Sequence, residues 1–172
     1  MDGNTPFDLA VETELFEIVK LLLVRTTIDP TRTYEDGDTV LHKAARRGQL
    51  EIVQLLLEIP CMDPNQKNKK GDSPLHSAVK RGYFDTVKLL LERTDIDVNC
   101  VNEEDDTLLH LAVKGGYIDI VKSLLELTDI DPNKVNEDAD TPLHLAVECG
   151  CLDIVKLLLE QTDIDPNKVN EV

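Results

Sequence analysis

The chain has 172 residues, of which 41% are hydrophobic, and its 34 acidic against 18 basic residues give a formal net charge of −16. This hydrophobic fraction is sufficient for a packed core and argues against wholesale disorder. So acidic a chain lacks the large basic patch that nucleic acid requires, and no run of about 18 apolar residues is present to span a membrane. We therefore expect a folded protein that neither binds nucleic acid nor inserts into a membrane.

The sequence repeats every 34 residues. The four histidines follow this spacing, as do one alanine, one valine and one aspartate in each of five units. A period of this length is typical of repeat proteins. We expect a single domain over residues 1–172, with repeats at approximately 1–36, 37–70, 71–104, 105–138 and 139–172.

The fifth repeat shows the expected order of elements. Thr141 is suited to cap a first helix and Pro142 to begin it, and Gly150 to end it. A second helix is predicted over Leu152–Glu160. Its apolar residues point in too many directions to form one apolar face, so this helix must be covered on more than one side. Asp163–Asn167 favours a turn, and the polar residues beyond it predict a hairpin or loop.

A single such unit cannot bury its own apolar faces. Neighbouring units can cover one another, so the helices of successive repeats should stack in layers. We therefore expect an all-α fold of stacked helix-turn-helix units with projecting loops.

Several motifs resemble those of the ankyrin-repeat family. They are Ser73–Ala78 (Ser-Pro-Leu-His-Ser-Ala), Thr141–Ala146 (Thr-Pro-Leu-His-Leu-Ala) and Gly116–Val121 (Gly-Tyr-Ile-Asp-Ile-Val). The resemblance extends over the whole chain and implies an ankyrin solenoid with hairpins projecting from the helices. It also implies a structural role, bonding turn groups of their own and neighbouring repeats, for His42, His76, His110 and His144.

The chain departs from the family pattern in several places. Each repeat has one residue more than the usual 33, located after the second helix. In the first repeat, Asp8 replaces the histidine and Glu14 replaces a glycine. Asp105 and Ala139 stand where Gly37 and Gly71 occur in other hairpins.

The resemblance also implies a binding face, the concave face, made of the hairpin tips and the ends of the first helices. Its first-helix positions carry cations, with two tyrosines beside them as possible anchors: Arg46, Arg47, Lys80, Arg81, Lys114, Tyr83 and Tyr117. Its hairpin positions carry Lys69, Lys70, Asp72, Glu103 and Asp106. We expect this face to meet an acidic stretch of a partner, so that reversing Arg46, Arg47, Lys80 and Arg81 to Glu abolishes binding with little change in melting. The alternatives are that the cations only neutralise the acidic hairpins and that the tyrosines only pack.

The sequence predicts no catalytic, cofactor or metal site. Equivalent histidines in helices about 8–10 Å apart cannot share a zinc ion whose ligands lie about 2 Å away. Cys149 lies near His144 but no orienting third group is evident. The acidic runs near Glu103 and Glu137 lack the spacing and central glycine of a calcium loop.

We therefore expect a non-enzymatic module that binds another protein through its concave face. A second possibility is a regulatory or targeting domain of a larger enzyme or effector whose catalytic part lies outside this chain. A third, an engineered scaffold, is disfavoured by the irregular first repeat and four free cysteines.

Compartment and assembly follow from smaller features. The four cysteines contain no Cys-x-x-Cys pair and the N-terminus lacks a signal-peptide pattern, which favours the cytoplasm or nucleus, or another cell's interior for a delivered effector.

We expect a monomer. Weak self-association through the uncapped ends is a further hypothesis, because Ile154, Val155 and Leu158 have no following repeat to cover them.

Overall fold

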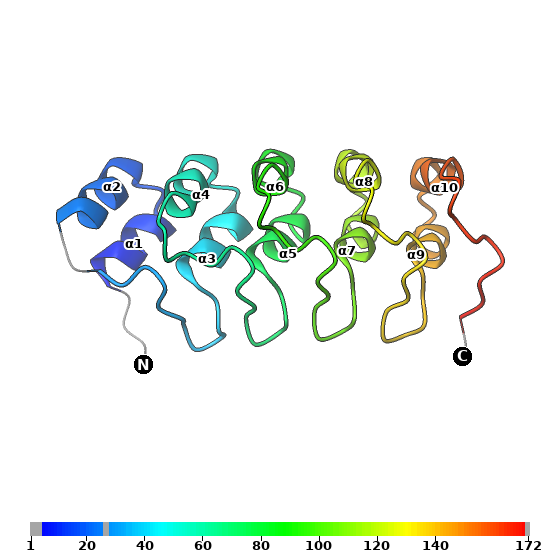
Figure 1. Ribbon diagram of the computed structural model, residues 1–172, viewed down its shortest axis with the longest axis horizontal. Coiled ribbons are helices and arrows are strands. Elements are labelled where there is room, and N and C mark those ends of the chain that lie inside the picture. Colours follow the sequence, from blue (N-terminus) through cyan, green and yellow to red (C-terminus); the bar gives the residue numbers. More distant parts are fainter. Residues whose placement is uncertain (1–4, 26–27, 171–172) are drawn as a thin grey trace. The chain divides into compact units, whose positions relative to one another are not determined.

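The computed structural model describes residues 5–25 and 28–170, so the ends of the first and last expected repeats, residues 1–4 and 171–172, lie outside the described residues. The chain forms two compact units, residues 1–96 (unit 1) and 97–172 (unit 2), each of which is described by itself. Over the described residues the structure contains ten helices and no strand (Figure 1). The single-domain organisation stays a prediction.

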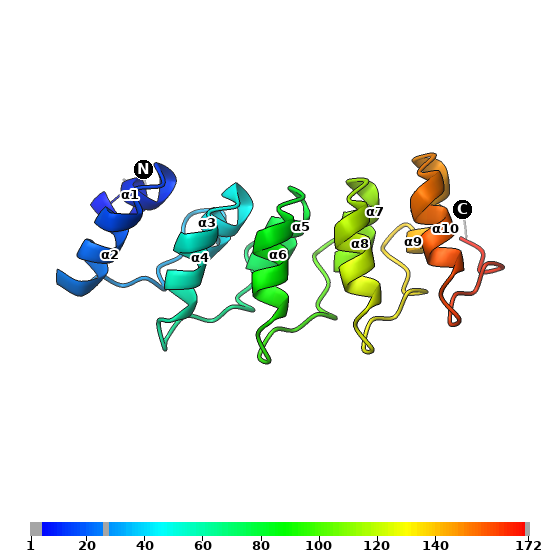
Figure 2. The same cartoon turned by 90° about the horizontal axis from the view of Figure 1, so that it is seen from above.

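Unit 1 contains three helix pairs: α1 (Pro6–Glu12) with α2 (Phe16–Arg25), α3 (Val40–Arg47) with α4 (Leu50–Leu57), and α5 (Pro74–Val79) with α6 (Phe84–Leu91). The first helices α1, α3 and α5 lie in one row next to the loops, and α2, α4 and α6 lie side by side in a second row (Figures 1 and 2). Unit 2 contains two pairs in the same arrangement, α7 (Leu108–Lys114) with α8 (Ile118–Leu125), and α9 (Pro142–Glu148) with α10 (Leu152–Leu159). The prediction of stacked helix-turn-helix units is confirmed.

Stacking accounts for the core of each unit. In unit 1, Ile52 of α4 packs behind another helix pair and is 3% exposed, whereas the equivalent Ile18 of α2, in the first pair of the structure, is 44% exposed. In unit 2, Val113 of α7 is fully buried, whereas the equivalent Val147 of α9, in the last pair of the structure, is 62% exposed. Each full burial of such a side chain contributes about 1.5–3 kcal/mol, so stacking supplies much of the stability that a single repeat lacks.

A reciprocal cap starts the first helices. In α3, Thr39 accepts a hydrogen bond at its hydroxyl from the His42 N–H, and the His42 Nδ1 accepts one from the Thr39 N–H. The imidazole thus performs the role that Glu has in the usual capping box. The helices α5, α7 and α9 begin in the same way.

The first repeat achieves the same cap with a carboxylate. Asp8 accepts the Thr5 N–H at 2.7 Å, and it also accepts a short hydrogen bond from the Tyr34 hydroxyl. Burial raises the pKa of Asp8, but these bonds and the Arg32 charge outweigh it and hold the pKa below its ordinary 3.8. The Lys43 ammonium in turn lies 3.3 Å from the centre of the Tyr34 ring. Asp8, which stands where the other repeats have histidine, is thus held by partners of its own.

The loops before the first helices are five-residue hairpins closed by a backbone hydrogen bond. In unit 1, Tyr34 N–H donates to the Asp38 carbonyl and Asn68 N–H to the Asp72 carbonyl, both at 2.9 Å. The fourth residue of each hairpin has a positive φ: 78° at Gly37, 70° at Gly71, 55° at Asp105 and 60° at Ala139. The two residues that replace glycine therefore adopt the glycine conformation, which costs an L-residue about 1 kcal/mol or more.

The extra residue after each second helix lies in a turn that contacts the next turn. In unit 2, the Asn133 side-chain amide donates to the Asp163 carbonyl at 2.6 Å, and its oxygen accepts the Asp165 N–H at 2.7 Å. In unit 1, Asn65 donates to the Asp95 carbonyl at 2.6 Å. The departure from the family length thus leaves the stacking intact.

Candidate partner-binding surface

A hollow of about 290 Å³ lies on the concave face of unit 1. It is bounded by the hairpins that end at Asp38 and Asp72 and by the helices α3 and α5. Nine polar or charged residues line it: Asp36, Asp38, Arg46, Asn68, Lys70, Asp72, Ser77, Lys80 and Arg81.

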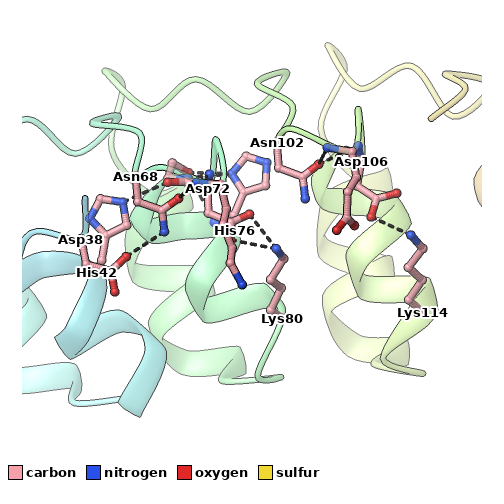
Figure 3. Close-up of polar contacts among 12 residues, drawn as sticks. Asp38, His42, Asn68, Asp72, His76, Lys80, Asn102, Asp106 and Lys114 are labelled. Carbon is pink, nitrogen blue, oxygen red and sulfur yellow. Dashed lines mark hydrogen bonds and ion pairs between the residues drawn. The ribbon is translucent and has the colours of Figure 1, made fainter. Parts of the chain in front are cut away.

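Two of the lining cations are already engaged. Arg46, in the last turn of α3, pairs with the fully buried carboxylate of Asp38 at 2.6 Å. Lys80, the C-cap of α5, pairs in the same way with the buried Asp72 at 2.8 Å (Figure 3). Each pair joins the end of a hairpin to the end of the helix that follows it, so it fixes the hairpin on the helix.

Asn68 links the two hairpins to each other. Its amide nitrogen donates to Asp38 at 2.7 Å, and its oxygen accepts the N–H groups of Lys70 and Asp72 (Figure 3). Sequence reasoning missed Asn68, although the signal was present. Asparagine recurs at the same hairpin position, at Asn102, Asn136 and Asn170.

These contacts differ from the sequence expectation for five of the predicted site residues, which form ion pairs within the protein: Arg46, Lys80, Lys114, Asp72 and Asp106. Asp72 lies buried at the base of its hairpin and not at the tip, because Lys80 holds it there. In unit 2, Asp106 is likewise buried and paired with Lys114 at 2.7 Å. Removal of such a cation leaves a buried carboxylate unpaired, which costs up to about 3 kcal/mol when the cation is partly exposed. We therefore revise the expectation for the four-residue reversal: the changes at Arg46 and Lys80 should lower the melting temperature.

Four other predicted cations have free side chains. Arg47, Arg81, Lys69 and Lys70 are exposed, and within the described part of the chain none of these side chains has an ion pair or hydrogen bond. Only Lys70 and Arg81 line the hollow. These two are the cations of the hollow that remain available to a partner.

The two tyrosines lie outside the hollow. In unit 1 the Tyr83 ring lies against Gly48, where an added Cβ would overlap ring atoms, and 40% of the side chain remains exposed. In unit 2 the Tyr117 ring covers Gly115 in the same manner. Both positions therefore support the packing alternative more than the anchor hypothesis.

Unit 2 repeats the hairpin arrangement with different exposed charges. Asn136 donates to Asp106 at 3.0 Å, as Asn68 does to Asp38 in unit 1. The exposed tip residues are acidic, at Glu103 and Glu104, where unit 1 carries Lys69 and Lys70. The free basic charge of the concave face is thus concentrated in unit 1.

The histidines hold neighbouring hairpins. The Nδ1 atoms of His42 and His110 accept backbone N–H groups, so their protons lie on Nε2, which donates to the carbonyls of Asp72 at 3.0 Å and Asp140 at 2.9 Å. Burial is the main cause that lowers the pKa of both imidazoles below 6.5. His76 and His144 form the same contacts to their capping residues, Ser73 and Thr141. These bonds support a structural role for all four residues.

The described residues also bear on metal binding and on membrane insertion. Among residues 5–25 and 28–170, no three or more His, Cys, Asp or Glu side chains gather where they would hold a metal ion. None of the described helices has the length and apolar character needed to cross a membrane.

Helix pairs, imidazole caps and projecting hairpins define a helical-repeat protein. A family model described as ankyrin repeats (3 copies) matches residues 7–102 and 94–170, and the chain belongs to the ankyrin-repeat family. A comparison with curated proteins finds no match. Ankyrin repeats are generally protein-protein interaction modules and generally non-catalytic.

Proposed function

We propose that this protein binds a partner protein through its concave face, made of hairpin tips and first helices, without catalysing a reaction. The observation that carries the proposal is the hollow of unit 1, which contains two cations without an ion-pair partner, Lys70 and Arg81. They lie beside a framework of two ion pairs, Arg46–Asp38 and Lys80–Asp72. Fold alone does not supply a partner, so the proposal depends on this surface.

The framework is suited to recognition because it is fixed before binding. Asp38 is held by both Arg46 and Asn68, and the hairpin of Asp72 is held by Lys80 and by the Nε2 of His42. Binding to a surface with such fixed side chains loses less conformational entropy than binding to a loop that must be ordered. No disulfide joins any of the four cysteines, all of which lie in the described part of the chain, and this fits the proposed location in the cytoplasm or nucleus.

Site-specific photo-cross-linking from the intact protein in its native lysate tests the proposal. A photoreactive residue at Arg47, on the concave face, should cross-link a protein partner, which is then identified. The matched control is the same residue at Lys88, which is exposed on α6 in the other row of helices. Cross-links that form only from position 88 would contradict the proposal.

A further inference from the structure

We infer that the hollow of unit 1 binds carboxylate side chains of an extended acidic segment of the partner, with Lys70 and Arg81 as the two recognition cations. The inference rests on the proposed function and names the chemistry of the partner at that surface. It depends on which charged side chains of the hollow already form ion pairs within the protein and on where the unpaired cations lie.

The charges of the hollow do not cancel. It is lined by four cations and three carboxylates. Two of the carboxylates, Asp38 and Asp72, are each paired with a cation of the following helix. The third, Asp36, accepts the Asp38 N–H at 3.0 Å. That hydrogen bond fixes Asp36 but leaves its negative charge, so the lining has one cation in excess and Lys70 and Arg81 are its cations without a carboxylate partner. The hollow is thus basic by one charge in a chain whose net charge is −16.

The two free cations approach the hollow from different sides. Lys70 belongs to the hairpin between Asn68 and Asp72, and Arg81 follows the C-terminal end of α5. The buried Ser77 of α5, 4% exposed, adds a hydroxyl to the lining. Arginine offers a planar pair of donors that suits a carboxylate, and lysine offers a mobile point charge. A segment with two acidic side chains can therefore contact both cations.

The hollow has room for side chains of a bound segment. Its volume of about 290 Å³ is close to the lower end of the range of about 300–1,000 Å³ usual for small-molecule pockets. The overall negative charge does not prevent the contact, because at physiological salt charges further than about 8 Å away are largely screened. The local cations then dominate the interaction with a bound carboxylate.

Fluorescence anisotropy with a labelled peptide of about ten glutamates tests the inference on the full chain, with a glutamine peptide of equal length as the uncharged control. The glutamate peptide should bind, and K70E and R81E should each weaken it by about tenfold or more. K88E is the matched control, because it makes the same change of charge at an exposed lysine of α6, which does not line the hollow. This control should change the affinity by less than about twofold.

Several outcomes would overturn the inference. They are no binding of the glutamate peptide, equal losses for K88E and K70E, and competition by inorganic phosphate as effective as that by free glutamate peptide, which would indicate a general anion site. Circular dichroism on each variant verifies that it is folded. If the peptide fails to bind while cross-linking from Arg47 still captures a protein, the acidic-segment inference fails alone. If both fail, the proposed function fails with it.

Discussion

Replacement of His110 by alanine should destabilise the protein more than the same change at His144. The His110 ring accepts hydrogen bonds from the Thr107 N–H at 3.2 Å and hydroxyl at 2.8 Å, and donates one to the Asp140 carbonyl at 2.9 Å. At about 1 kcal/mol for each bond, the loss is about 3 kcal/mol. His144 is only half-buried and has the two Thr141 contacts but no described Nε2 bond, so its loss is about 2 kcal/mol.

Urea and thermal unfolding followed by far-ultraviolet circular dichroism measures both variants against the unmodified chain, which contains no tryptophan. A loss of about 3 kcal/mol corresponds to a fall in Tm of about 6–12 °C for a protein of this size. The slope of the urea transition has to be the same for the variants and the unmodified chain. A changed slope would show that unfolding is no longer two-state, which can happen in repeat proteins, and the free energies could then not be compared. Equal effects of the two substitutions, or a cost at His110 below about 1 kcal/mol, would refute the assignment of an inter-hairpin bond to its Nε2.

Four further predictions use the same unfolding measurements or sedimentation. K80E should lower Tm while R81E leaves it unchanged, because only Lys80 pairs with a buried carboxylate; equal effects would contradict this. Because burial lowers the folded-state pKa of His42 and His110 below 6.5, the unfolded chain takes up more protons below that pH. Stability should therefore be constant above about pH 7 and fall as the pH decreases from about 6.5, and a double His→Gln variant should flatten this dependence. Ala139→Gly should stabilise the chain by about 0.5–1 kcal/mol, since φ is 60° there, and a loss of stability would count against strain in that hairpin. The expectation that Ile154 and Leu158 lie uncovered is wrong, because they are 3% and 0% exposed, whereas Val147 is 62% exposed. Sedimentation at high concentration should therefore show weak self-association that Val147→Glu reduces; an unmodified chain that stays monomeric would exclude this.

The helices could be predicted from sequence because periodicity and capping are local signals. The expected second helix Leu152–Glu160 is observed as Leu152–Leu159, and the expected first helix after Thr141 runs from Pro142 to Glu148. The glycine-like hairpin position was also visible in the repeat pattern, and the positive φ at Asp105 and Ala139 shows that the repeat overrides residue preference there.

The partners of the charged side chains could not be predicted in the same way. Asp72 and Asp106 stand in polar loops, where an acidic residue is normally solvated, yet both are buried. Their burial depends on a cation eight positions later, Lys80 or Lys114, which the sequence presents as part of a binding row. Which cations are paired and which are free can therefore be determined only from the structure, and the proposed role of the hollow depends on this difference.

Nuclear magnetic resonance of the labelled protein, titrated with the glutamate peptide, tests most directly whether an acidic segment is bound in the hollow. We predict that the largest amide shifts fall on Gly37, Lys70, Ser77 and Arg81, which line the hollow or border it. Shifts confined to α2, α4 and α6, in the other row of helices, would contradict the account.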